Sequence, residues 1–171
     1  MIMINKINKF FILNSHLISI CFFLLIDSTP IYILKDYSIK LQISIIIIYC
    51  WICKNPYCLR PFFILLLGLV IDLLKNYFFG FTSLFMTLIL FIQQRDQTIL
   101  SNQKFSITWI RFFIFISLTN LFLAILHKFN NPEIEINSLE LLFTTLMSML
   151  IFPIVYWLVF NLDEKRKNYV E

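Results

Sequence analysis

The chain has few charged residues and almost no glycine. Only 14% of its 171 residues are charged and 60% are hydrophobic, whereas an ordinary soluble domain is about 25% charged. A soluble fold of this length has too small an interior to bury so much apolar surface. We therefore expect the bilayer to be the solvent for most of the chain. No loop between the apolar runs is long enough to fold as a soluble domain.

The presence of only two glycines argues against a membrane barrel built from many tight turns. The apolar runs also lack the alternation that is typical of lipid-facing strands. Helices are the remaining way for a backbone to satisfy its N–H and C=O groups in lipid. The composition thus predicts an all-α polytopic membrane protein, with one integral membrane domain over residues 1–171.

The sequence also lacks the motifs of common catalytic and metal sites. It has no Gly-rich phosphate loop, no His-Glu-x-x-His and no Ser or Cys beside a plausible base. Cys50 and Cys53 have the spacing of a redox or zinc motif, but they end an apolar run, where Cys behaves as a small hydrophobe. The only histidines, His16 and His127, lie far away in sequence. We expect no enzymatic activity, no cofactor, no metal site and no nucleic-acid partner.

Charge-free apolar runs mark six expected transmembrane helices, since a crossing needs about 20 residues. The first run could be a secretory signal, but no small-x-small cleavage site follows it, so we expect a retained span. The second and third runs are short. They either cross the bilayer or form a shallow hairpin, and the charges favour crossing. The expected spans are about 10–26, 38–53, 61–75, 77–94, 106–126 and 140–162, followed by a short cytoplasmic tail at 163–171.

Basic residues predict the orientation, because they concentrate in cytoplasmic loops. With both chain ends inside, ten of the fourteen Lys and Arg residues lie on the inner side. The longest outer loop is acidic, with Glu133, Glu135 and Glu140. All three tryptophans then lie at inner ends of spans, at the interface that aromatic rings prefer; they are Trp51, Trp109 and Trp157.

Asp72 is the most informative residue of the third run, because a carboxylate near the bilayer centre costs roughly 2.5–3.5 kcal/mol. Gly68 lies on the same helical face, and small residues allow close helix approach in membranes. Two interpretations remain open. Asp72 lies in a packing seam that receives another helix, or it ends the span near the outer surface and pairs with Lys75. Gly80 suits the following turn, after which Thr82 or Ser83 would cap the return helix.

Asn120 lies at roughly the depth of Asp72 in the fifth span, so a hydrogen bond between these two helices is a further hypothesis. His16 lies within the first span, where we expect an interhelical hydrogen bond rather than a proton relay. The candidate residues of a packing seam or partner-binding groove are therefore Gly68, Asp72, Gly80 and Asn120.

The region from Trp51 to Trp109 resembles the rod shape-determining protein MreD family. The matching residues are Trp51, Pro56, Arg60-Pro61, Gly68-Leu69, Asp72-Leu73-Leu74 and Gly80-Phe81-Thr82-Ser83-Leu84. Gln93-Gln94-Arg95 at the end of the fourth span, Trp109 at the start of the fifth and Pro153 in the last also fit.

This resemblance implies a multi-pass protein of the bacterial plasma membrane without chemistry of its own. Such a subunit of the cell-elongation machinery associates with the single-span protein MreC, alongside MreB and the wall glycosyltransferase and transpeptidase, and supports cell shape and peptidoglycan synthesis. The family fold is similar to the substrate-binding subunit of energy-coupling-factor transporters. The alternative function is therefore a vitamin-binding subunit of such a transporter, which would need a cavity that opens outward.

Overall fold

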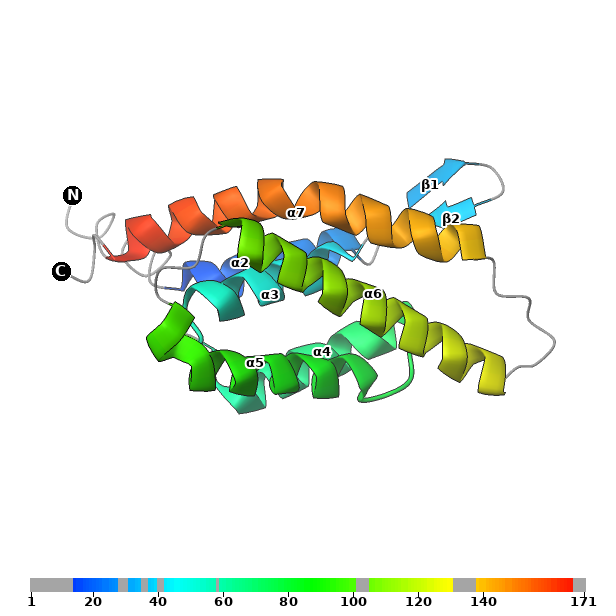
Figure 1. Cartoon of the computed structure of the whole chain (residues 1–171), viewed down its shortest axis with the longest axis horizontal. Coiled ribbons are helices and arrows are strands. Elements are labelled where there is room, and N and C mark those ends of the chain that lie inside the picture. The colour runs from blue at the N-terminus through cyan, green and yellow to red at the C-terminus, as the bar shows by residue number, and fades with distance from the viewer. Residues whose placement is uncertain are drawn as a thin grey trace.

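The computed structural model describes residues 14–27, 31–34, 37–39, 42–57, 59–100, 105–130 and 138–167. Within these ranges the chain forms six helices and one small hairpin (Figure 1). In chain order the elements are α2 (Ser15–Asp27), β1 (Ile31–Leu34), β2 (Tyr37–Ile39), α3 (Ile43–Lys54), α4 (Pro61–Lys75), α5 (Phe81–Leu100), α6 (Phe105–Asn130) and α7 (Ser138–Lys167).

The predicted helical class is confirmed, and the hairpin is the departure from it. β1 and β2 pair antiparallel, with Ile31 opposite Ile39 and Tyr32 opposite Ser38. We expected the second helical span to begin at about residue 38. That start was wrong, because Ser38 and Ile39 belong to β2 and α3 begins only at Ile43. The β-branched and aromatic residues of this segment favour a strand.

Consecutive helices run in opposite directions. Figure 1 shows the start of α2, the end of α3, the start of α4, the end of α5, the start of α6 and the end of α7 at the same end of the molecule. The end of α2, the start of α3, the end of α4, the start of α5, the end of α6 and the start of α7 lie at the opposite end. We call the first the amino end, because α2 begins there, and the second the distal end.

The central helix is α3, which packs against α2, α5 and α7. Every residue from Ser44 to Ile52 is buried, and a helix that is apolar on all sides belongs in an interior. Aromatic rings extend this core outward, with Phe112 of α6 stacked on Phe152 of α7 at 4.5 Å between ring centroids. Trp51 is fully buried and donates its Nε1–H to Ser19 Oγ at 3.0 Å. Internal packing, rather than a lipid interface, therefore places this tryptophan.

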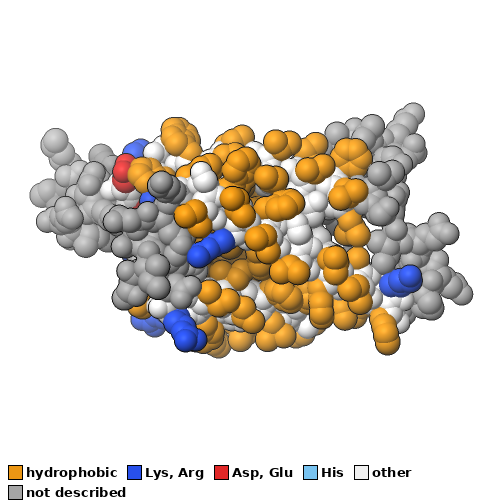
Figure 2. Space-filling model, viewed as in Figure 1, with side chains coloured by type: hydrophobic (Ala, Val, Ile, Leu, Met, Phe, Trp, Pro, Cys, Tyr) orange, Lys and Arg blue, Asp and Glu red, His pale blue; other side chains and the backbone are white. Residues whose placement is uncertain are grey.

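The outside of the molecule is apolar. Large hydrophobic side chains on α4, α5, α6 and α7 are exposed, and they cover much of the middle of the face drawn in Figure 2. Among the described helices, two are long and apolar enough to cross a membrane, over Phe105–Leu126 and Leu141–Arg166. Ser15–Asp27 and Ile43–Lys54 are shorter apolar helices. So large an exposed apolar surface is unusual for a soluble monomer.

Candidate functional site

Gly68 lies at a close approach between α4 and α5. A Cβ atom at this position would stand 2.3 Å from Ser83 Cα and 2.6 Å from Ser83 N. Both of these are backbone atoms, so α5 itself would have to move. The close approach also brings the Ser83 hydroxyl to the Leu65 carbonyl, to which it donates at 3.0 Å. The structure therefore places Gly68 in a seam between two helices of this chain.

Asp72 lies at the end of the same seam, 1% exposed. Its Oδ1 accepts a hydrogen bond from the Thr82 backbone N–H at 3.1 Å, in the first turn of α5. The first N–H groups of a helix have no partner within it, and their end of the helix dipole attracts negative charge. Asp72 of α4 thus caps the following helix. This cap was missed by the sequence analysis, which assigned the role to Thr82 or Ser83.

The α4–α5 turn, between Lys75 and Phe81, contains two residues with positive φ. Asn76 has φ 53° and ψ 39°, in the left-handed region, and ends α4. Gly80 has φ 86°, where a residue without Cβ is favoured. A Cβ at Gly80 would meet nothing within 4 Å, so its backbone conformation, and not close packing, accounts for glycine there.

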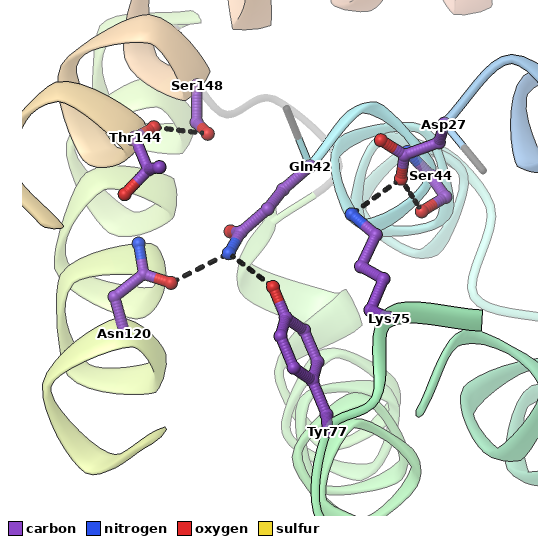
Figure 3. Close-up of polar contacts among 8 residues, drawn as sticks. All are labelled: Asp27, Gln42, Ser44, Lys75, Tyr77, Asn120, Thr144 and Ser148. Carbon is purple, nitrogen blue, oxygen red and sulfur yellow. Dashed lines mark hydrogen bonds and ion pairs between the residues drawn. The ribbon is translucent and has the colours of Figure 1, made fainter. Parts of the chain in front are cut away.

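Asp27 plays the same part for α3 that Asp72 plays for α5. Figure 3 shows its carboxylate between Ser44 and Lys75. Oδ2 accepts from the Ser44 backbone N–H at 3.2 Å and from the Ser44 hydroxyl, and the Lys75 ammonium lies 2.7 Å away. The side chains of Lys75 and Asp27 are 8% and 2% exposed. The alternative interpretation of the sequence paired Lys75 with Asp72, whereas the structure joins it to the end of α2.

Gln42, at the N-cap of α3, links three elements at the distal end. Its Nε2 donates to Asn120 Oδ1 of α6 at 2.7 Å and lies 3.3 Å from the Tyr77 hydroxyl (Figure 3). The predicted hydrogen bond between Asp72 and Asn120 was wrong, because Asn120 faces Gln42 and Asp72 faces the start of α5. A helix position fixes the depth of a residue, but the rotation of the helix decides which neighbour it meets.

His16 lies edge-on to Trp51, with ring centroids 5.9 Å apart. The Ser19 hydroxyl donates to the His16 carbonyl at 2.9 Å and accepts from Trp51, so these residues join α2 to α3. Cys53 accepts a hydrogen bond from Gln93 Nε2 at 3.1 Å. Among the residues that the structure describes, no group of three or more His, Cys, Asp or Glu side chains could hold a metal ion.

Between α5 and α6 lies a shallow groove of about 360 Å³. The two helices meet mainly through aromatic rings near the distal end, such as Phe81 stacked on Phe122 at 5.6 Å. Two rows of exposed apolar side chains flank the groove, and Tyr49 of α3 contributes to its floor. Gln93 and Arg111 add polar groups. The rows are Leu84, Leu88 and Ile92 on α5 and Ile110, Ile114 and Leu118 on α6.

A second cavity, of about 670 Å³, lies between α6 and α7 toward the distal end. Its wall is apolar except for four side chains, and Asn120 is the buried one among them. Gly68, Asp72 and Gly80 therefore gather at the α4–α5 seam and turn, while Asn120 belongs to the α6–α7 side. The four polar residues of this cavity are Ser117, Asn120, Lys128 and Thr145.

Searches with this sequence and structure identify no relative: no family model, no curated protein and no solved structure matches the chain.

Proposed function

We propose that the chain is a non-enzymatic, multi-pass subunit of the bacterial cell-elongation machinery, similar to the MreD family, and that it seats the transmembrane helix of MreC. In this proposal all six helices cross the plasma membrane, and both chain ends lie in the cytoplasm. The resemblance over Trp51–Trp109 motivates the proposal. The alternation of helix directions supports it, since six crossings would return the chain to the side from which it started.

The observation that carries the proposal is the groove between α5 and α6. Its flanking rows recur at intervals of four residues, as do the ridges of a helix. Leu84, Leu88 and Leu118 are 72%, 58% and 57% exposed, so they remain available to another helix. In lipid, helices associate through close packing and a few hydrogen bonds rather than through the hydrophobic effect. The groove offers both, with Gln93 and Arg111 as its polar groups.

Affinity purification from native membranes, followed by mass spectrometry, tests the proposal. The wild-type chain is expected to retain an MreC-type single-span protein and wall-elongation enzymes. Leu88→Trp, which places a bulky ring in the groove, should reduce that recovery. Ile154→Trp on α7, whose native side chain is 67% exposed, is the matched control and should leave it unchanged. Recovery of transporter ATPases in place of elongation proteins would overturn the proposal in favour of the vitamin-binding subunit.

A further inference from the structure

The α6–α7 cavity contains a buried hydrogen-bond donor that the protein leaves without an acceptor. Asn120 is 4% exposed, and its Oδ1 is engaged by Gln42 at 2.7 Å. Its Nδ2 has no hydrogen-bond partner. Figure 3 shows this nitrogen on the side of Thr144 of α7, whose hydroxyl donates to the Leu141 carbonyl. A buried donor without a partner is costly, so an acceptor from another molecule would stabilise the site.

The surroundings of the cavity indicate where that molecule comes from. Leu121, Ile125 and Leu142 line it and are 58%, 52% and 58% exposed. These side chains form an apolar rim on the outside of the helix pair. Under the proposed membrane placement this rim faces lipid, so an occupant enters from the bilayer rather than from water. A partner helix, about 10–12 Å wide, packs on such a rim, whereas a lipid chain is thin enough to reach Asn120.

Lys128 gives the cavity a cation at its distal end. It lies eight residues beyond Asn120 on α6, about 12 Å along the axis, and it lines the same cavity. Both side chains line one cavity, and the Cα–Cβ bonds of a helix tilt toward its N-terminus, which is the direction from Lys128 to Asn120. A phosphate near Lys128 and an ester carbonyl near Asn120 match the polar groups of one glycerophospholipid. Lysine binds phosphate groups as a point charge, and under the proposed placement Lys128 lies at the outer side of the membrane.

We propose that the α6–α7 cavity is a binding site for a single anionic glycerophospholipid. The Lys128 ammonium pairs with the lipid phosphate, and Asn120 Nδ2 donates to an ester carbonyl. One acyl chain runs from there past Ser117 toward the middle of the bilayer. The site depends on the membrane placement but not on the proposed partner helix, because that helix would pack between α5 and α6.

Native mass spectrometry of the purified full-length chain tests this site. The protein is exchanged from mixed micelles that contain phosphatidylglycerol or phosphatidylcholine. Wild type is expected to retain one phosphatidylglycerol about tenfold more tightly than phosphatidylcholine, because the choline cation of phosphatidylcholine neutralises the phosphate with which Lys128 pairs. Lys128→Gln should remove this preference. Ala124→Leu, which adds three carbon atoms inside the cavity, should weaken the retention of both lipids.

Ile154→Phe adds similar bulk at an exposed position of α7 outside the cavity and should retain lipid as wild type does. Equal retention by wild type and Ala124→Leu would overturn the proposal, because the lipid would then bind elsewhere. Equal retention of the two lipids by wild type would overturn the assignment of the cavity to an anionic lipid. A water-soluble molecule that co-purifies with wild type but not with Ala124→Leu would assign the cavity to a different ligand class.

Discussion

At the scale of single residues, two aspartate carboxylates each accept a hydrogen bond from a backbone N–H at the start of another helix. Asp27, the last residue of α2, accepts from Ser44 near the start of α3. Asp72 of α4 accepts from Thr82 near the start of α5. Neither helix receives a hydrogen bond from a conventional Ser, Thr or Asn side chain at its own N-cap, which is Gln42 for α3 and Gly80 for α5. The position of each of these acidic residues in or beside an apolar run is therefore explained by the hydrogen bond that it accepts from the start of the next helix.

Gly68 is expected to be the less replaceable of the two glycines. A Cβ at Gly68 would lie 2.3 Å from a backbone atom of α5, and overpacking of this kind costs about 1–3 kcal/mol or more. Gly80→Ala meets no neighbour and strains only the backbone, at roughly 1–2 kcal/mol. Thermal unfolding in detergent should show a larger loss of stability for Gly68→Ala. A larger loss for Gly80→Ala would show that the turn, and not the seam, is the limiting feature.

The ion pair between Lys75 and Asp27 is expected to behave as a buried pair. Lys75→Met should destabilise the protein by about 3–5 kcal/mol, because it leaves the Asp27 carboxylate buried without its counter-ion. The double variant Lys75→Met, Asp27→Asn removes both charges, and the asparagine oxygen can still accept from Ser44. It should recover most of the lost stability in the same unfolding assay. A double variant no more stable than Lys75→Met would contradict the buried pair.

At the scale of the elements, α3 is short for a helix that crosses a bilayer. Its 12 residues extend about 18 Å, less than the hydrocarbon core of about 30 Å. Under the proposed placement its first N–H groups lie within the apolar layer, where backbone groups need partners from the protein. Asp27 accepts a hydrogen bond from the Ser44 N–H at that end, whereas the Gln42 side chain binds Asn120 and makes no capping hydrogen bond. The Asp27 carboxylate thus supplies a partner for the start of this short helix inside the protein.

The start of α5 should depend on Asp72 in a way that hydrogen exchange can resolve. Asp72→Leu removes the acceptor of the Thr82 N–H, and loss of an N-cap costs about 0.5–2 kcal/mol. The amides of Thr82 and its neighbours should then exchange faster, while those in the middle of α5 remain protected. Asp72→Asn keeps an oxygen acceptor and serves as the control. If both variants exchange alike at Thr82, the carboxylate does not cap α5.

Sequence reasoning located α4 well, because Pro61 suits the first turn of a helix and Lys75 ends the apolar run. It identified Gly68 and Asp72 as members of one face, which the α4–α5 seam explains. It missed the roles of Gln42 and Asp27, because Gln42 lies inside the expected second span as one polar residue and Asp27 only follows the expected first span. The partner of Asn120 could not be predicted, because helix rotation and tilt are properties of the packed molecule.

At the scale of the whole molecule, the alternation of helix directions makes a prediction about the two ends of α4. Tyr57, in the α3–α4 connection, and Phe79, in the α4–α5 connection, are 68% and 71% exposed. They lie beyond opposite ends of a helix of 15 residues, about 22 Å long. If α4 crosses the bilayer, these positions meet different compartments. If α3 and α4 form a shallow hairpin, both meet the same one.

Single cysteines at these positions, in a chain whose native cysteines are replaced, distinguish the two arrangements. Phe79→Cys is expected to react with a membrane-impermeant maleimide in intact cells, and Tyr57→Cys only after the cells are permeabilised. The expected difference follows from the proposed cytoplasmic location of the amino end, where the α3–α4 connection lies and where basic residues such as Lys54 and Arg60 favour the inner side. Reaction of both positions from outside would exclude six crossings and favour the shallow hairpin of α3 and α4, which leaves four crossings and still returns the chain to its starting side.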